Sequence, residues 1–320
     1  MEELELLGQS IAKGKGYQLK LDIAKLHTHT KIEVPIIVER GKKDGPTILL
    51  TGGIHGNEIN GIDIVRNIIS RKFNKPAAGM VICIPVVNIF GFLNQTRQFP
   101  DGRDLNRVFP GSARGSLASR FAYHIVKDIV PLADYCIDFH TGGDARFNVS
   151  QIRVDFRNEE SLRLAKLFGA PFIVDSNERD KSFRQILNNL GKKVLLFEGG
   201  MSLNINSQIT QTGVGGTLQI MHELGMRDFS KEIEEFADFN EPDPILISDS
   251  TWIRANHSGI FHPGVDLGQR INKGEIIGSI TDPYGFFDKK IKARASGYVI
   301  CVNRAPLVNQ GDAIIHISRD

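Results

Sequence analysis

The chain contains a series of short apolar runs, rich in β-branched residues, that alternate with segments whose apolar residues recur at helical spacing. Such an alternation predicts an α/β domain with a mainly parallel sheet. Two helices are expected between the strands, one beginning at Glu58 and one covering Ser116–Val130. The expected strands are Thr47–Thr51, Met80–Val87, Tyr135–Phe139, Pro171–Val174 and Val194–Phe197.

The length and composition indicate a folded, soluble protein. A chain of 320 residues is long enough for roughly two domains of ~150 residues. Hydrophobic residues make up 41% and charged residues 24%, which is ordinary for a well-packed globular protein. The formal net charge of +2 gives no sign of a nucleic-acid or membrane partner, so we expect neither. The oligomeric state is left open, and a homo-oligomer is compatible with this composition.

The sequence also indicates a cytoplasmic location. The N-terminal segment Met1–Glu5 is acidic and lacks the basic start and apolar core of a signal peptide. No uninterrupted apolar stretch approaches the ~18 residues of a membrane span. The three cysteines, Cys83, Cys136 and Cys301, are far apart and lie inside apolar runs. We therefore expect buried, reduced thiols rather than disulfides.

Two prolines in the segment 241–244 predict a linker. We place a catalytic domain at residues 1–243 and a β-rich domain at 244–320. Ile253–Ile260 is repeated as Ile291–Tyr298, and two similar halves of this length resemble the barrel-sandwich fold of biotinyl and lipoyl carrier domains. We interpret this domain as a structural module that caps or shapes a neighbouring site. The alternative is a carrier domain with a modified lysine, because Asp288-Lys289 matches the Asp-Lys context of such lysines.

Polar residues capable of binding a metal follow the expected strands. His55 and Glu58 come directly after the first strand, and His140 ends the third. The carboxyl ends of parallel strands meet at one edge of a sheet, so these side chains are expected to lie together. Two histidines and one carboxylate, with a position left for water, are typical of hydrolytic zinc. We expect Asp138 to point to the opposite face of its strand. A role as the hydrogen-bond partner of a metal-binding histidine is therefore only the alternative for this residue.

Glu198 ends the apolar run Val194–Phe197 and is followed by two glycines. It therefore lies at the same sheet edge as the three metal-ligand candidates. A carboxylate beside a metal-bound water can take a proton from it and later deliver one to a leaving nitrogen. The alternative is a solvated or salt-bridged glutamate at a strand end.

A loop punctuated by proline and glycine, residues 97–111, concentrates three arginines and an asparagine. Arginine binds carboxylates in a two-pronged geometry and can stabilise an oxyanion. Arg97, Arg103, Asn106 and Arg107 are therefore candidates for binding a substrate. The alternative is a loop held together by Arg–Asp pairs, with Arg103–Asp104 the clearest example.

Together these motifs resemble the succinylglutamate desuccinylase/aspartoacylase family, a branch of the zinc carboxypeptidase fold. The resemblance spans about residues 30–225 and rests on four segments in the family's order: Gly53–Glu58, Arg103–Gly111, Asp138–Gly142 and Phe197–Gly200. It implies a mixed sheet flanked by helices, followed by a smaller β-rich domain. It also implies a single zinc ion held by His55, Glu58 and His140.

The same resemblance implies roles for the other candidates. Glu198 would be the general base and acid, and Asn106 and Arg107 would hold the substrate carboxylate. Arg97, or Arg103 as the alternative, would polarise the scissile carbonyl. The family also uses a tyrosine from the C-terminal domain, for which Tyr284 is a candidate.

The activity implied is hydrolysis of the amide of a small N-acyl amino acid. The runner-up is a metallocarboxypeptidase that acts on short peptides or glutamyl tails, and a non-catalytic binding protein is a third option. The chain contains neither a GxSxG elbow nor a P-loop, which disfavours a serine hydrolase and a nucleotide-dependent enzyme.

Overall fold

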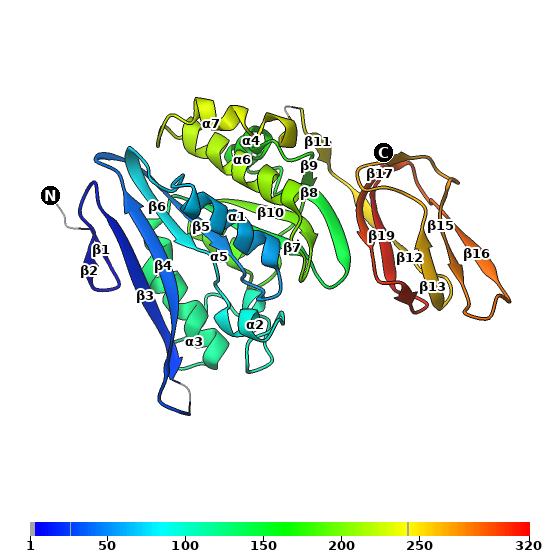
Figure 1. Ribbon diagram of the computed structural model, residues 1–320, viewed down its shortest axis with the longest axis horizontal. Coiled ribbons are helices and arrows are strands. Elements are labelled where there is room, and N and C mark those ends of the chain that lie inside the picture. The colour runs from blue at the N-terminus through cyan, green and yellow to red at the C-terminus, as the bar shows by residue number, and fades with distance from the viewer. Residues whose placement is uncertain (1–3, 26, 242) are drawn as a thin grey trace.

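The computed structural model describes residues 4–25, 27–241 and 243–320 (Figure 1). The strands before the linker are β1 Glu5–Leu6, β2 Gln9–Ser10, β3 Gly16–Lys25, β4 Lys31–Arg40, β5 Lys43–Gly52, β6 Ala78–Ile84, β7 Tyr135–Gly142, β8 Arg146–Val154, β9 Phe172–Asp175 and β10 Lys193–Met201. The strands after it are β11 Ile245–Ile247, β12 Ser250–Arg254, β13 Gly259–Pro263, β14 Arg270–Ile271, β15 Ile276–Thr281, β16 Asp288–Lys292, β17 Gly297–Asn303, β18 Leu307–Val308 and β19 Ala313–Ser318.

Helices connect the strands of the first part of the chain. The α-helices are α1 Ile59–Ser70, α2 Ile89–Leu93, α3 Leu117–His124, α4 Glu159–Phe168, α5 Phe183–Asn189, α6 Ser207–Glu223 and α7 Ser230–Glu234. Shorter helical segments are η1 Leu105–Arg107, η2 Ile125–Ile129, η3 Val130–Leu132 and η4 Ala237–Phe239. The expected second helix is therefore divided into α3, a π-helical turn and a short 3-10 turn.

The sheet has a parallel centre and antiparallel margins. β6, β5, β7 and β10 lie side by side in this order, and each neighbouring pair is parallel. β4 and β3 continue the sheet antiparallel beyond β6, and β8 continues it antiparallel beyond β10. The expected strands are all present, and the fold class predicted from the sequence is confirmed.

Helices cover both faces of this sheet, so its central strands are buried on both sides. Ile48 and Leu50 of β5 pack in one core together with apolar residues of α1, α4 and α6. Leu49, between them, points to the other face and packs with residues of α3 and α5. Buried parallel strands of this kind read as continuous apolar runs, which is why they stood out in the sequence.

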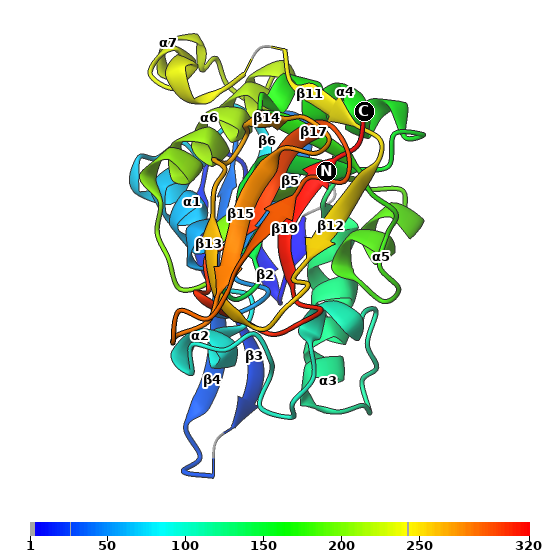
Figure 2. The ribbon, with the colours of Figure 1, turned by 90° about the vertical axis from the view of Figure 1, so that its right-hand side faces the viewer.

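The C-terminal residues form a separate β-rich core that is joined to the main sheet (Figures 1 and 2). β16, β15, β13 and β18 make an antiparallel sheet, whereas β17 pairs with β8 through Cys301–Asn303. The hydrogen-bonded sheet therefore runs without a break from the main part of the chain into the C-terminal part. The boundary at 243/244 stays a prediction, and Pro242 of the expected linker lies outside the described residues.

Lys289 lies within β16, paired with Ile280, and not in the loop between β15 and β16. A modified lysine on a carrier domain lies at a hairpin tip, so this position does not favour the carrier alternative. The three cysteines are buried and free, as predicted. Within residues 4–25, 27–241 and 243–320, none of the helices is long and apolar enough to cross a membrane.

Candidate metal centre and active site

The loop after β5 brings His55 and Glu58 to the carboxyl end of the parallel strands. It requires glycine at position 56, because a Cβ there would lie 1.9 Å from the carbonyl carbon of Gly91. Glu58 occupies the N-cap position of α1 but does not cap the helix with its side chain. Its carboxylate is directed instead at the two histidines.

Glu58 lies between the two histidines. Its Oε1 is 2.8 Å from Nδ1 of His55, and its Oε2 is 3.0 Å from Nδ1 of His140. The backbone N–H of Thr141 donates a hydrogen bond to Oε2 at 3.1 Å. All three side chains are buried, and one ligand atom from each lies within 4.8 Å of the others. The structure thus brings the three predicted metal ligands into one group.

Each histidine contacts a second carboxylate through its other nitrogen. Nε2 of His55 is 3.1 Å from Oδ1 of Asp104, and Nε2 of His140 is 2.7 Å from Oδ2 of Asp138. The expectation that Asp138 points away from His140 is wrong, because residues two positions apart on a strand share a face. Carboxylates in this position fix the orientation of metal-bound histidines and make them better ligands.

The donor set fits a divalent cation. A neutral imidazole has one N–H group, whereas both nitrogens of His55 and of His140 face acceptor-only carboxylates. If each ring donates its N–H to Asp104 or Asp138, both Nδ1 atoms present a lone pair to Glu58. A cation among the two Nδ1 atoms and the Glu58 carboxylate would satisfy all of them, and two nitrogens with one carboxylate suit zinc.

The histidines and carboxylates of the site shift one another's pKa values. Burial alone would raise the pKa of Glu58, but His55 and His140 outweigh it and hold that pKa well below its usual range. Burial likewise opposes the charged form of His140, yet Asp138 and Glu58 raise its pKa well above the ordinary value. Both shifts have the same cause, the attraction between the carboxylates and positive charge on the histidines.

Arg97 and Arg103, the two candidates for polarising the scissile carbonyl, lie in different surroundings. Arg97 lies in the pocket, where its Nη1 is 3.3 Å from Oε1 of Glu58 and its Nη2 is 2.9 Å from Oδ2 of Asp104. Arg103 is 53% exposed and pairs with Asp101 at 3.3 Å. Among the described residues, the pocket lining includes Arg97 but not Arg103. The Arg103–Asp104 pair named in the alternative interpretation of this loop is not formed, because Asp104 contacts Arg97 and His55 and Arg103 pairs with Asp101.

Asn106 and Arg107 line the same pocket from η1. The backbone N–H of Phe183 donates to Oδ1 of Asn106 at 2.8 Å, which fixes the asparagine side chain. Arg107 donates through Nη1 to the carbonyl of Asn106 at 2.6 Å. Asp104 holds η1 by accepting a hydrogen bond from the N–H of Asn106 at 2.9 Å. One aspartate therefore connects this loop to His55.

Glu198 lies on β10 directly beside His140 of β7, because the two residues are paired in the parallel register. Together with the metal group it lines a pocket of about 760 Å³. The C-terminal strands contribute Trp252 and His316, whose rings are stacked with 4.7 Å between their centroids. Burial, with a smaller effect of Arg153, lowers the pKa of His316 to about 3, so this ring is neutral.

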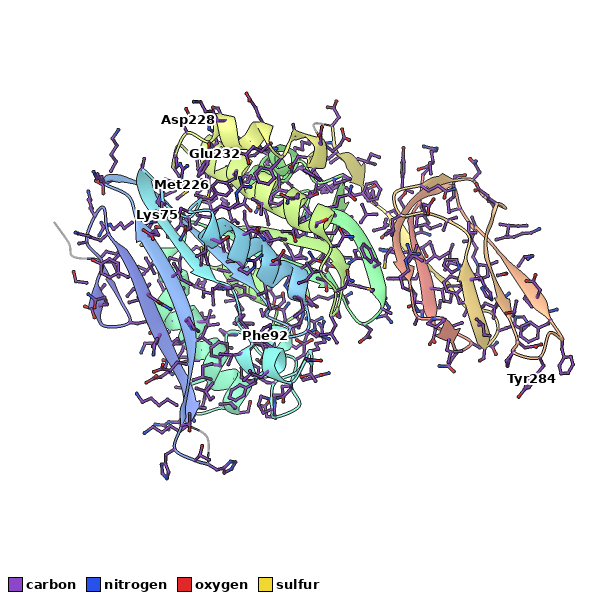
Figure 3. The ribbon with its side chains drawn as sticks, in the orientation of Figure 1. Lys75, Phe92, Met226, Asp228, Glu232 and Tyr284 are labelled. Atoms are coloured by element: carbon purple, nitrogen blue, oxygen red, sulfur yellow. The ribbon has the colours of Figure 1, made fainter. Side chains whose placement is uncertain are left out.

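Tyr284 does not reach this pocket. It is 78% exposed at the tip of the C-terminal part, in the loop between β15 and β16, and stacks on Phe286 (Figure 3). It is absent from the pocket-lining residues in the described part of the chain. The sequence contained no motif to anchor this tyrosine, and the C-terminal wall of the pocket is built by Trp252 and His316 instead.

Comparison with known proteins identifies the family. Residues 44–224, more than half of the chain, match the succinylglutamate desuccinylase/aspartoacylase catalytic domain. The chain belongs to the succinylglutamate desuccinylase/aspartoacylase family. Members of this family are hydrolases that act on amide bonds. The family predicted from the sequence motifs is confirmed.

Within the family, the chain is 30% identical over 302 residues to N-alpha-acetyl-L-2,4-diaminobutyric acid deacetylase from Halomonas elongata, covering 90% of this chain and 86% of that protein. A solved succinylglutamate desuccinylase/aspartoacylase from Rhodobacter sphaeroides is 25% identical, with a TM-score of 0.82 and coverage of 96% and 95%. The ectoine utilization protein EutE (DoeB) from Ruegeria pomeroyi, solved with product bound, has the same fold, with a TM-score of 0.83, 21% identity and 99% coverage of each chain.

Asp138, the carboxylate that contacts Nε2 of His140, gives a first testable prediction. Replacing Asp138 by asparagine should weaken the binding of a divalent cation, with zinc as the probe, by about 10–100-fold, because a neutral amide oxygen accepts the Nε2–H of His140 more weakly than a carboxylate does. Competition with a chromophoric chelator measures this affinity. Asp155→Asn, which removes the carboxylate partner of the exposed Arg157 outside the site, is the matched control and should bind zinc like the unmodified protein. Equal zinc affinity of Asp138→Asn and the control would contradict this role.

Proposed function

We propose that the protein is a zinc-dependent deacylase that hydrolyses the amide bond of a small N-acyl amino acid. The observation that carries the proposal is the group of His55, Glu58 and His140 at a strand edge shared with Glu198. We further propose one zinc ion per chain, a cytoplasmic location, and no nucleic-acid or membrane partner.

A zinc ion held by these residues would lower the pKa of a water molecule and polarise the acyl carbonyl. Glu198 accepts a proton from the attacking water as the new carbon–oxygen bond forms. When the carbon–nitrogen bond breaks, the same carboxyl group donates that proton to the leaving nitrogen. The products are the free carboxylic acid and the free amine, and Glu198 returns to its ionised form.

Arginines of the loop 97–111 provide the other roles. Arg97 is held by Asp104 beside the metal group, where its guanidinium can stabilise negative charge that develops on the carbonyl oxygen. Arg107, next to the fixed side chain of Asn106, can bind the carboxylate of the amino acid. These contacts would orient the amide between the metal group and Glu198.

The substrate is proposed from the pocket and from the relative in Halomonas elongata. The pocket has a volume of about 760 Å³, which suits a small amino acid derivative. N-alpha-acetyl-L-2,4-diaminobutyric acid is the first compound to assay, since the relative that is 30% identical deacetylates it. A panel of N-acetyl and N-succinyl amino acids and dipeptides, tested with the zinc-loaded protein, checks the proposal. Cleavage of dipeptides in preference to every N-acyl amino acid would overturn it in favour of a carboxypeptidase.

Arg97 and Arg103 provide a matched pair of variants. Arg97→Met should lower kcat by about 10²-fold, because it removes a charged donor at the reacting carbonyl. Arg103→Met removes the same charge from an exposed position in the same loop, so its kcat should equal that of the unmodified enzyme. Initial rates at saturating substrate give kcat, and metal analysis checks that zinc remains bound. The reverse order of effects would reassign the carbonyl-polarising role to Arg103.

A further inference from the structure

Two side chains of β8 contact the two carboxylate oxygens of Glu198. Nδ2 of Asn148 donates a hydrogen bond to Oε2 at 2.7 Å, and Nε of Arg153 lies 3.5 Å from Oε1, an ion-pair distance. Asn148 is buried, and Arg153 lies in the wall of the pocket. We call these two residues the Asn148–Arg153 pair.

An irregularity in β8 places both side chains next to Glu198. Leu196 and Glu198 of β10 oppose Arg153 and Gln151, but Gly200 opposes Asn148, so β8 contains one extra residue in this interval. In a regular strand, Asn148 and Arg153 would point to opposite faces, because their positions differ by an odd number. The β-bulge turns Asn148 to the same face as Arg153. Bulges beside active sites commonly redirect a side chain in this way.

The backbone on both sides of the bulge is fixed. Arg184 donates through Nη1 to the carbonyl of Arg153 at 3.0 Å, which holds the end of β8 in place. Asn148 is also paired with Cys301 of β17, where the C-terminal part joins the sheet. The positions of Asn148 and Arg153 are therefore set by the main sheet and by the C-terminal strands together.

A glutamate side chain without such contacts would distribute its carboxylate over several rotamers, and holding it in one of them costs entropy. A charge-assisted hydrogen bond and an ion pair on separate oxygens fix the position of the carboxylate and also stabilise its ionised form. Proton transfer depends on this position, since a displacement of about 1 Å can reduce a rate by about 10²-fold.

We propose that Asn148 and Arg153 are positioning residues that hold Glu198 in the orientation required for proton transfer. The proposal rests on the proposed function, in which Glu198 is the general base. In this account neither residue binds the substrate itself, and their effect passes through the Glu198 carboxylate.

Kinetic variants test the proposal. Asn148→Leu removes the donor at nearly constant volume, and Arg153→Met removes the charge but keeps the length of the side chain. Each should lower kcat about 10- to 100-fold with little change in KM. Arg153→Lys keeps the charge and should recover part of the loss. Arg157→Met, which removes an exposed arginine just after β8, is the control and should leave both constants unchanged.

A double-mutant cycle decides whether the effect passes through Glu198. In a Glu198→Gln background, the base is already absent, so adding Arg153→Met or Asn148→Leu should cause little further loss. A rise in KM that persists in the Glu198→Gln background would overturn the proposal, because Arg153 would then bind substrate. Fully additive losses in kcat would also overturn it.

Crystal structures of Arg153→Met and Asn148→Leu test the proposal without any substrate. We expect the Glu198 carboxylate to move or to occupy more than one rotamer while His55, Glu58 and His140 keep their positions. A Glu198 carboxylate that stays in place in both variants would overturn the positioning role. If the protein hydrolysed no amide but the carboxylate moved as expected, the proposed function would fail and the positioning would stand.

Discussion

Replacing Glu198 by glutamine is expected to lower kcat by about 10²–10⁴-fold while zinc remains bound. The amide has nearly the same shape as the carboxylate, but it cannot accept a proton from the attacking water. Zinc binding should persist, because His55, Glu58 and His140 contact one another without using Glu198. Steady-state kinetics and metal analysis of the same preparation measure the two quantities.

The proper control for Glu198→Gln is a carboxylate that lies outside the pocket and pairs with an arginine, as Glu198 does. Glu160→Gln in α4 removes the partner of Arg163 on the surface and should leave kcat unchanged. Near-full activity of a zinc-loaded Glu198→Gln variant would show that another group accepts the proton. The assignment of the general base would then be wrong, although the metal site would stand.

Replacing Glu58 by glutamine is expected to remove the metal, and with it all measurable hydrolysis. Glu58 is the residue that both histidines contact, and the N–H of Thr141 and Arg97 also donate to it. A neutral amide at this position leaves the group without its negative charge. The affinity for zinc should fall by more than the about 10–100-fold loss expected when a carboxylate that contacts only a histidine ligand, such as Asp138, is replaced.

Metal analysis after dialysis, with calorimetric titration of zinc, checks the Glu58→Gln variant. Circular dichroism and a melting curve establish that the variant is folded, and Asp138→Asn provides the intermediate case. A folded Glu58→Gln variant that binds one zinc ion with unchanged affinity would place the metal elsewhere in the molecule.

The parts of the site that could be predicted from the sequence lie close to the ends of buried strands. His55, His140 and Glu198 each follow an apolar run, and the parallel order of the strands brings such positions to one edge. Asp138 could also have been found, because the period of two residues along a strand places it on the face of His140. The sequence therefore contains the signal that places Asp138 beside His140.

Other parts depend on features that local sequence does not contain. Asn148 reaches Glu198 only because of a bulge in β8, and Trp252 and His316 reach the pocket because β17 extends the main sheet. The bulge and the extension of the sheet are both determined by pairing between strands that are not adjacent in the chain. The choice of Arg97 over Arg103 likewise follows from the path of the loop, in which Asp104 faces His55.

The measurement that tests the central claim most directly is a zinc titration of the metal-free protein with an N-acyl amino acid as substrate. The chelated protein should not hydrolyse N-alpha-acetyl-L-2,4-diaminobutyric acid or the other N-acyl compounds of the panel. Added zinc should restore release of the acyl group and saturate at one ion per chain. Hydrolysis at an equal rate in the thoroughly chelated protein, or no hydrolysis of any N-acyl compound after zinc is bound, would contradict the account.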